Sequence, residues 1–285
     1  MTYKNFRSLP LLVLLVVLLS ACTVKQSYHQ LDWVLAGMVD DYVTLSEEQE
    51  FALDTHITAL LKWHRGTQLS MYVTDLRQLQ QYTSHALTAS EVEDISNRIV
   101  RSWQAIKQRV APDMAETLLS LSASQQAELF ENIREQNQKL DDEYKEYTQQ
   151  ERWQRAGDKL IEKFEDWLGE LTDQQKAMLR AWPPKYKPLY SQRMAFRMKW
   201  QAALKQVLES TQPIDEKRQR LIDMITTPDT FRTAKYRQEL ADNIALTKQL
   251  MIEFVKTFTK SQRSFLTERL QQLITSLSEL AAEKS

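Results

Sequence analysis

Glycine and cysteine are both scarce in this chain, which has four glycines and one cysteine among 285 residues. Sandwiches, barrels and nucleotide-binding α/β folds use glycine in tight turns and where the backbone approaches a phosphate, so these classes are excluded. A single cysteine excludes an intrachain disulfide framework and a cysteine-based zinc cluster. Lys and Arg total 37 against 38 Asp and Glu, so the net charge of -1 gives no argument for nucleic acid.

The first 22 residues have the layout of an export signal. Lys4 and Arg7 precede an uninterrupted apolar run over residues 9–19. The run is shorter than the roughly 20 residues that a transmembrane helix needs, and its length is typical of a signal peptide. Residues 19–22, Leu-Ser-Ala-Cys, resemble the bacterial lipobox, with the cysteine at its last position.

That resemblance implies cleavage before Cys22 and covalent attachment of lipid to its sulfur, with no other cofactor. We therefore expect a lipoprotein signal peptide over residues 1–21, a lipidated tether over 22–27 and a single helical domain over 28–285. Each buried CH₂ contributes about 0.8 kcal/mol, so two or three acyl chains anchor a protein to a membrane durably. Thr23 follows the cysteine where Asp would favour the inner membrane, so we expect the periplasmic face of a Gram-negative outer membrane. An uncleaved anchor, or a soluble export signal with a chance cysteine, is the alternative.

The mature chain is predicted to be almost entirely helical, because apolar residues recur at helical spacing and no strand pattern with turn chemistry is present. The expected helices cover residues 28–43, 47–64, 69–87, 89–110, 122–167, 189–210, 214–226, 229–257 and 260–282. Gly66 is expected to break a helix, and Pro112 to lie in the first turn of another. The tract 182–188, which holds three prolines, is expected to be a stiff connector. The predicted fold is all-α, an elongated bundle of long antiparallel helices.

One motif occurs four times and consists of an apolar residue, Ser or Thr, two variable positions and Gln. Its copies are residues 45–49, 121–125, 171–175 and 258–262. Each copy predicts a capping box, in which the hydroxyl accepts from the third helical N–H and the Gln side chain reaches back to the cap N–H. The position that usually completes a hydrophobic staple is polar in every copy, so we expect the leading Leu or Phe to pack between helices. The unequal spacings exclude a solenoid of fixed period.

The Leu-Thr-x-x-Gln form of this motif resembles that of the small periplasmic stress chaperones, the Spy and Cpx-accessory group. That resemblance covers the short motifs alone. It implies an all-helical, cradle-shaped dimer that holds unfolded clients without ATP.

A second resemblance covers most of the mature chain. Its tracts are Tyr28-x-x-Leu31-Asp32-Trp33, Asp40-Asp41-Tyr42-Val43-x-Leu45-x-x-x-Gln49, Trp63-His64-Arg65, Glu151-Arg152, Asp166-Trp167-Leu168-Gly169-x-Leu171-Thr172-x-x-Gln175 and Trp182. They look like a family of uncharacterised proteobacterial lipoproteins of the outer-membrane type. Residues 68–72 read Gln-Leu-Ser-Met-Tyr where that family has Glu-Leu-Pro-x-Tyr. The resemblance implies a lipid anchor and a helical fold, and it brings no activity.

Catalytic and metal-binding patterns are missing from the sequence. None of the four histidines, at positions 29, 56, 64 and 85, has a His or Cys partner three or four residues away. No hydrolase elbow, zinc-protease motif or phosphate loop occurs, so we expect neither an enzyme nor a metal site. His64 is the best single candidate for a special role, with packing at a helix end as the preferred alternative. An enzymatic role requires a cleft in which carboxylates from distant helices meet His64.

The charges are unevenly distributed along the chain. Residues 174–208, the basic tract, carry eight bases and no acid, while residues 131–173 carry 13 acids and seven bases. Two helices folding back on each other with complementary charge, their aromatic residues in the core, is the interpretation that helical spacing favours. The alternative is an exposed basic surface for anionic or unfolded partners. Its candidate binding residues are Arg180, Lys185, Lys187, Arg193, Arg197 and Lys199.

Together these features predict a lipid-anchored envelope protein that acts by binding, as a helical interaction module or a chaperone-like module. Its expected partners are the membrane, through the lipid, and unfolded or envelope proteins. No nucleic acid is expected as a partner of an exported protein. The alternative function is a scaffold or spacer that links the outer membrane to peptidoglycan or to an envelope complex.

Overall fold

The computed structural model describes residues 21–283, and the predicted signal peptide falls almost wholly outside this range. The described residues form helices and no strand, so the predicted all-α fold is confirmed. The α-helices are α2 (Ala21–Tyr28), α3 (Leu31–Asp40), α4 (Glu47–Trp63), α5 (Leu69–Tyr82), α6 (Ala89–Leu119), α7 (Ala123–Lys145), α8 (Gln149–Leu168), α9 (Asp173–Arg180), α10 (Tyr190–Glu209), α11 (Ile214–Thr226), α12 (Ala234–Val255) and α13 (Lys260–Ala282). A π-helical turn, η1 (His64–Gln68), and two 3₁₀ turns, η2 (Pro183–Lys185) and η3 (Pro228–Phe231), complete the secondary structure.

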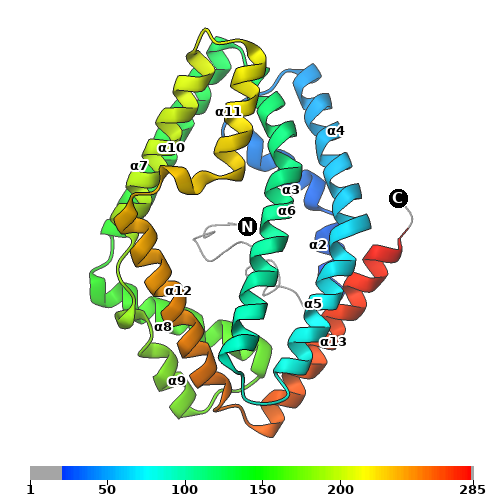
Figure 1. Ribbon diagram of the computed structural model, residues 1–285, viewed down its shortest axis with the longest axis vertical. Coiled ribbons are helices and arrows are strands. Elements are labelled where there is room, and N and C mark those ends of the chain that lie inside the picture. The colour runs from blue at the N-terminus through cyan, green and yellow to red at the C-terminus, as the bar shows by residue number, and fades with distance from the viewer. Residues whose placement is uncertain (1–20, 284–285) are drawn as a thin grey trace.

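The helices are arranged as an elongated frame (Figure 1). One long side consists of α4 and α5, and the other consists of α7 and α10 followed by α8 and α12. At one end α11 packs against α6, and at the other α9 packs against α8. The C-terminal helix α13 packs along α5 and also covers α2.

The frame has a hydrophobic core at each end instead of a single central core. The upper core, at the α11 end in Figure 1, contains buried residues between the starts of α4 and α7 and the helices α6, α10 and α11. Its members include Val43, Leu45, Leu121, Leu129, Leu204, Val207 and Leu221. The lower core joins α2, α5, α8, α9, α12 and α13, and its buried members include Leu69, Leu168, Leu179, Trp182, Leu250, Phe254 and Leu270.

The four motif glutamines join in two pairs, one at each core. In the lower core, Nε2 of Gln175 donates to Oε1 of Gln262 at 2.9 Å, and Nε2 of Gln262 donates back to Oε1 of Gln175 at 2.8 Å. Each Oε1 also accepts from the backbone N–H of its own N-cap residue, Thr172 or Thr259. The predicted capping boxes are therefore present, and the same side chains also connect two helices that start 87 residues apart.

Both amides in this pair use all of their hydrogen-bonding capacity. The second N–H of Gln175 donates to the carbonyl of Thr257 at 3.1 Å, and that of Gln262 donates to the carbonyl of Glu170 at 2.9 Å. Each carbonyl belongs to the residue just before the partner motif. A primary amide offers two N–H donors and two acceptor sites, so neither glutamine is left with an unmet donor although both are buried.

The upper core repeats this arrangement with a second pair. Gln49 donates to Oε1 of Gln125 at 3.2 Å and to the carbonyl of Ser120 at 2.8 Å. Gln125 donates back to Oε1 of Gln49 at 2.6 Å and to the carbonyl of Thr44 at 2.9 Å. This pair is half-buried, whereas Gln175 and Gln262 are buried, so the two pairs differ mainly in solvent access.

The leading apolar residue of each motif packs between helices. This was expected because the position that would complete a hydrophobic staple is polar in every copy. Leu45 and Leu121 are buried in the upper core. Leu171 is buried in the lower core, and Phe258 packs against that core while half-buried. The motif therefore places an apolar anchor and an amide pair at the same junction.

Two predicted helix breaks were wrong. Gly66 lies within η1, so α4 and α5 form one continuous helical rod, because a glycine in a helix costs only about 1 kcal/mol and α5 buries Leu69 and Val73 in the lower core. Pro112 lies inside α6, where packing of the buried Ala111 and Ala115 face offsets the missing N–H.

One predicted helix is divided in the structure. Residues 122–167 form α7 and α8, because Thr148 and Glu151 make a further capping box that starts α8.

Steric constraints explain why two nearby positions are occupied by glycine. A Cβ on Gly157 would lie 3.0 Å from Cα of Arg180, so α8 and α9 approach closely there. Gly169 ends α8 with a φ of 71°, a conformation that favours glycine.

The buried amide pair gives a stability prediction. Gln175→Glu keeps the capping oxygen but removes both donors, so the facing Gln262 oxygen and the Thr257 carbonyl lose their partners. We expect the free energy of unfolding to fall by about 3 kcal/mol. Gln49→Glu, the same change in the half-buried pair, is the matched control and is expected to cost about 1 kcal/mol. Urea unfolding followed by circular dichroism measures both, and equal losses would contradict the assignment.

Candidate functional site

The basic tract, residues 174–208, covers α9, η2 and most of α10. Two of its candidate binding residues pair with acids on other helices. Nε of Arg180 lies 3.2 Å from Oδ1 of Asp158, and Lys187 forms an ion pair with Asp242. These contacts match the interpretation in which neighbouring helices carry complementary charge.

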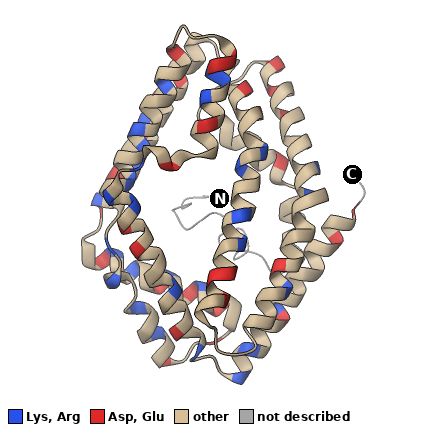
Figure 2. Cartoon of the chain, viewed as in Figure 1, with Lys and Arg blue, Asp and Glu red and all other residues tan. Residues whose placement is uncertain are grey.

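The other candidate residues lie in η2 and α10. Nε of Arg197 donates to Oδ1 of Asn137 on α7 at 2.6 Å, and the Arg193 guanidinium lies 5.8 Å from the centre of the Tyr190 ring. Two further candidates are exposed at the surface, Lys185 and Lys199. Figure 2 shows that Lys and Arg are spread over many helices and do not gather on α10 alone. Binding by these six residues stays a prediction.

The aromatic residues of the tract contribute mainly to the cores. Trp182 is buried in the lower core, where its ring meets Phe254 edge-on at 5.6 Å. The indole N–H of Trp200 donates to the carbonyl of Met224 in the upper core at 3.1 Å. Met198, an aliphatic residue of the same tract, is exposed. The tract is therefore divided, with aromatic side chains inward and bases outward.

His64 begins the π-helical turn η1 and lies in a cluster of aromatic side chains. Its Nδ1 is 3.0 Å from the Tyr28 hydroxyl, and the two rings stack with centres 5.8 Å apart. The Tyr72 ring meets the His64 ring edge-on at 5.5 Å, and Trp63 lies beside it. A π-turn within a helix is often found at functional sites, and here it places the imidazole against α2. The groups around His64 are thus aromatic, not the carboxylates that an enzymatic role requires.

Burial determines the protonation of this cluster. It lowers the pKa of His64 to about 4 and, with smaller effects from Tyr28 and Asp75, raises the pKa of Tyr72 to about 12. The Tyr72 hydroxyl is buried without a hydrogen-bond partner among the described residues. At neutral pH the imidazole and both phenols are uncharged, so the cluster acts as a packed joint between α2 and the α4–α5 rod.

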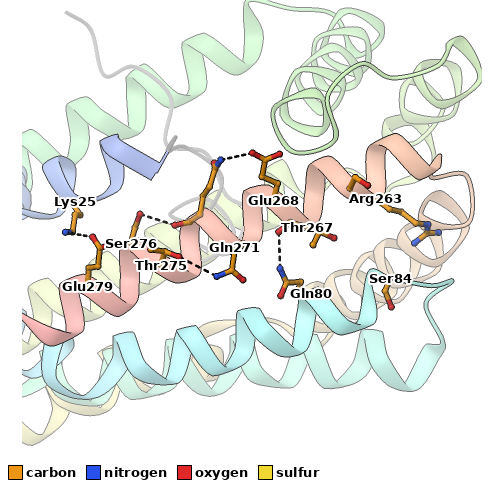
Figure 3. Close-up of a pocket in the computed structure, with 12 residues that line it drawn as sticks. Lys25, Gln80, Ser84, Arg263, Thr267, Glu268, Gln271, Thr275, Ser276 and Glu279 are labelled. Carbon is orange, nitrogen blue, oxygen red and sulfur yellow. Dashed lines mark hydrogen bonds and ion pairs between the residues drawn. The ribbon is translucent and has the colours of Figure 1, made fainter.

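A groove of ≈ 900 Å³ lies between α13, α5 and Lys25 of α2 (Figure 3). Hydroxyl and amide side chains line it, and many of them already bond within the protein. Nε2 of Gln80 donates to the Thr267 carbonyl at 3.0 Å, and Nζ of Lys25 lies 2.5 Å from Glu279 (Figure 3). The groove is shallow and open, and it does not bring a set of unmet polar groups together.

The start of the described chain is a helix packed on the body. Residues 22–27, expected to form a tether, belong to α2, because Val24 and Tyr28 are buried in the lower core. The side chain of Cys22, the predicted lipidation site, lies outside the described part of the structure. Cys22 precedes Val24, which is buried in the lower core, by two residues.

One surface is not predicted from the sequence, the α3–α4 face, which consists of Trp33, Val34, Met38 and Phe51. Trp33 and Phe51 are each 76% exposed and Met38 is 59% exposed. None of the ten residues of α3 is buried although most are apolar, and α3 packs on α4. A helix that is apolar on all sides is normally buried, so this pattern was the available signal.

Within residues 21–283, no group of three or more His, Cys, Asp or Glu side chains is placed to hold a metal ion. None of the helices described is both long and apolar enough to cross a membrane.

The lowered pKa of His64 predicts a dependence of stability on pH. The unfolded state takes up a proton near pH 6.5 and the folded state only near pH 4, so the histidine's contribution is full above pH 6.5 and is lost as pH falls. Between these values the wild type is expected to lose roughly 3 kcal/mol more than His64→Gln. Urea unfolding at several pH values measures the difference, with the exposed His85→Gln as control. Parallel wild-type and His64→Gln profiles would contradict a buried neutral imidazole.

Comparisons with known proteins give one match. A model of a family of unknown function, DUF6279, matches residues 41–237, which is more than half of the chain and includes three of the four motif glutamines. Neither a curated protein nor a solved structure is similar enough to count as a match. The chain therefore belongs to the DUF6279 family.

Proposed function

We propose that this chain is a lipid-anchored protein of the bacterial envelope that binds other proteins, as a chaperone-like or interaction module on the periplasmic side of the outer membrane. The observation that carries the proposal is the group of large apolar side chains held in solvent by a stiff helical frame. The two most exposed are Trp33 and Phe51. Concentrations of exposed apolar surface in a soluble body are typical of protein-binding sites.

The groove and the histidine cluster support binding over catalysis. The ≈ 900 Å³ groove is open and lined by polar side chains that bond to one another, so it has no enclosed apolar pocket for a small substrate. His64 lies among aromatic rings, and burial lowers its pKa to about 4, which is far below the range in which a general base works at neutral pH. A broad exterior surface is therefore the best candidate for function.

A lipid on Cys22 fits the geometry of α2. Residues 19–22 resemble a lipobox, and α2 follows without an intervening loop. Lys25 bridges α2 to Glu279 on α13, and Val24 is buried beneath it. An acyl chain on Cys22 would hold the helical body close to the membrane.

This same packing favours a second function, that of a scaffold or spacer. A body joined to its anchor through a packed helix keeps a fixed orientation on the membrane. A spacer requires such a fixed orientation, whereas a tethered binding module does not. Cross-linking in cells separates the two functions. One stoichiometric partner supports a scaffold, and many heterogeneous partners support a chaperone-like module.

The anchor is tested by metabolic labelling with palmitate. Wild-type protein is expected to incorporate label and to fractionate with the outer membrane, while Cys22→Ala incorporates none. Equal label in the two proteins would contradict the lipid anchor.

The binding activity is tested by suppression of aggregation. The probe is reduced insulin, and the protein is the mature chain, residues 22–285 with Cys22→Ser, which retains both cores. We expect light scattering to fall with rising protein concentration, because exposed apolar surface competes with self-association of the insulin chains. Scattering that does not change at a several-fold molar excess of the protein would contradict a chaperone-like function.

A further inference from the structure

Resting on the proposed function, we propose that the α3–α4 face is its binding surface and takes polypeptide segments that combine apolar side chains with Lys or Arg. This surface replaces the basic tract as the place where partners bind. The apolar side chains supply contact area, and the charges around them select the partner.

Apolar side chains are exposed along the length of α3. Val34 and Met38 are four residues apart and therefore one above the other on the helix, while Trp33, one residue before Val34, points about 100° away from it around the helix axis. Phe51 extends exposed apolar surface onto α4, the helix against which α3 packs. Tryptophan, methionine and phenylalanine are side chains that protein-binding surfaces favour, because they give large or adaptable contact areas.

The chain segment that carries this face has only negative charges. Residues 26–61 contain seven acids and no Lys or Arg. The acids are Asp32, Asp40, Asp41, Glu47, Glu48, Glu50 and Asp54, and all seven are exposed. None of them, among the contacts of the described residues, forms an ion pair. Elsewhere in the molecule, the exposed Asp158 and the half-buried Asp242 each have a basic partner from another segment of the chain.

Helical geometry places these acids next to the apolar side chains. On α4, Glu47 and Glu48 lie one turn before Phe51, and Asp54 lies one turn after it. On α3, Asp40 lies two turns from Trp33. A bound segment in contact with the aromatic rings would therefore also meet carboxylates.

The stability of the helices explains the positions of only some of these acids. Glu47, Glu48 and Glu50 occupy the first turn of α4, where the helix dipole favours negative charge. Asp40 and Asp41 are the last residue and the C-cap of α3, where the dipole disfavours it. Two adjacent unpaired carboxylates at a helix C-terminus destabilise the helix, which points to a role in contact with something else.

The chemistry of the face identifies the occupant. An anionic bilayer would be repelled by seven carboxylates, and interfacial helices carry Lys and Arg, which α3 lacks. The basic tract of a second copy is a poor fit, because Arg180 and Lys187 already have acidic partners within the chain. A polypeptide segment with apolar and basic side chains satisfies both components of the surface, with its positive charge steering the encounter.

The direct test uses two labelled 14-residue peptides that share the same Leu and Trp positions, one with Lys and the other with Glu at the remaining positions. Fluorescence anisotropy measures their binding to residues 22–285 with Cys22→Ser. We expect the Lys peptide to bind roughly tenfold or more tightly than the Glu peptide, and salt to reduce the difference. Equal binding of both peptides, or binding of neither, would overturn the proposal.

Two double variants locate the site. Trp33→Ser with Met38→Ser removes apolar area, and Asp40→Asn with Asp41→Asn removes charge. Each is expected to weaken binding of the Lys peptide by roughly tenfold. The matched controls are Val100→Ser with Ile244→Ser, exposed apolar residues elsewhere, and Glu135→Gln with Glu162→Gln, exposed acids elsewhere. All changed residues lie at the surface, and circular dichroism checks that the variants fold.

The outcomes separate this proposal from the proposed function. If the wild type suppresses insulin aggregation but the α3 variants bind the Lys peptide as well as the controls do, the α3–α4 face is not the site and the function stands. Absence of suppression by the wild type rejects the chaperone-like function, whatever the peptides do. Competition with the Lys peptide by phosphatidylcholine vesicles would identify the face as a membrane contact and overturn the proposal.

Discussion

The reciprocal glutamine pairs are the constraint on which this structure depends. A helix N-terminus leaves backbone N–H groups unmet, and bringing two such ends together would bury several polar groups at once. In the lower core, Gln175 and Gln262 each cap their own helix and also donate a hydrogen bond to the other amide, so these polar groups have partners. Gln49 and Gln125 do the same in the upper core. Each pair thereby joins segments that are distant in sequence at a defined angle and register.

Two such junctions, one at each end, produce a frame in place of a compact bundle. Helices that run between the cores, such as α6 and the α4–α5 rod, are held at both ends (Figure 1). The short helix α3 packs Leu31 against the lower core and Val39 against the upper core, but none of its residues is fully buried. The same stiffness that holds the cores apart can therefore keep an apolar face in solvent, available to a partner.

The fold class and the caps follow from local sequence, whereas the pairing does not. Apolar spacing predicts the helices, and the pattern Ser/Thr-x-x-Gln predicts each capping box, because both depend on neighbours along the chain. The second amide contact of Gln175 depends on a residue 87 positions away. The basic tract suggests a binding surface because its acidic partners are also distant in sequence and cannot be recognised from its own residues. Its partners Asp158 and Asp242 lie on other helices. The acids of the α3–α4 face, which are less conspicuous in the sequence, form no ion pair with a base among the described residues.

Site-specific photo-cross-linking in living cells tests the central claim most directly, that the frame presents the α3–α4 face to partner proteins. A photoreactive amino acid is placed at position 33 or 38, and at position 199 in the basic tract for comparison, in the full chain with its signal intact. The account predicts protein adducts from positions 33 and 38 and few from position 199. Adducts from position 199 alone, or only lipid adducts at positions 33 and 38, would contradict it.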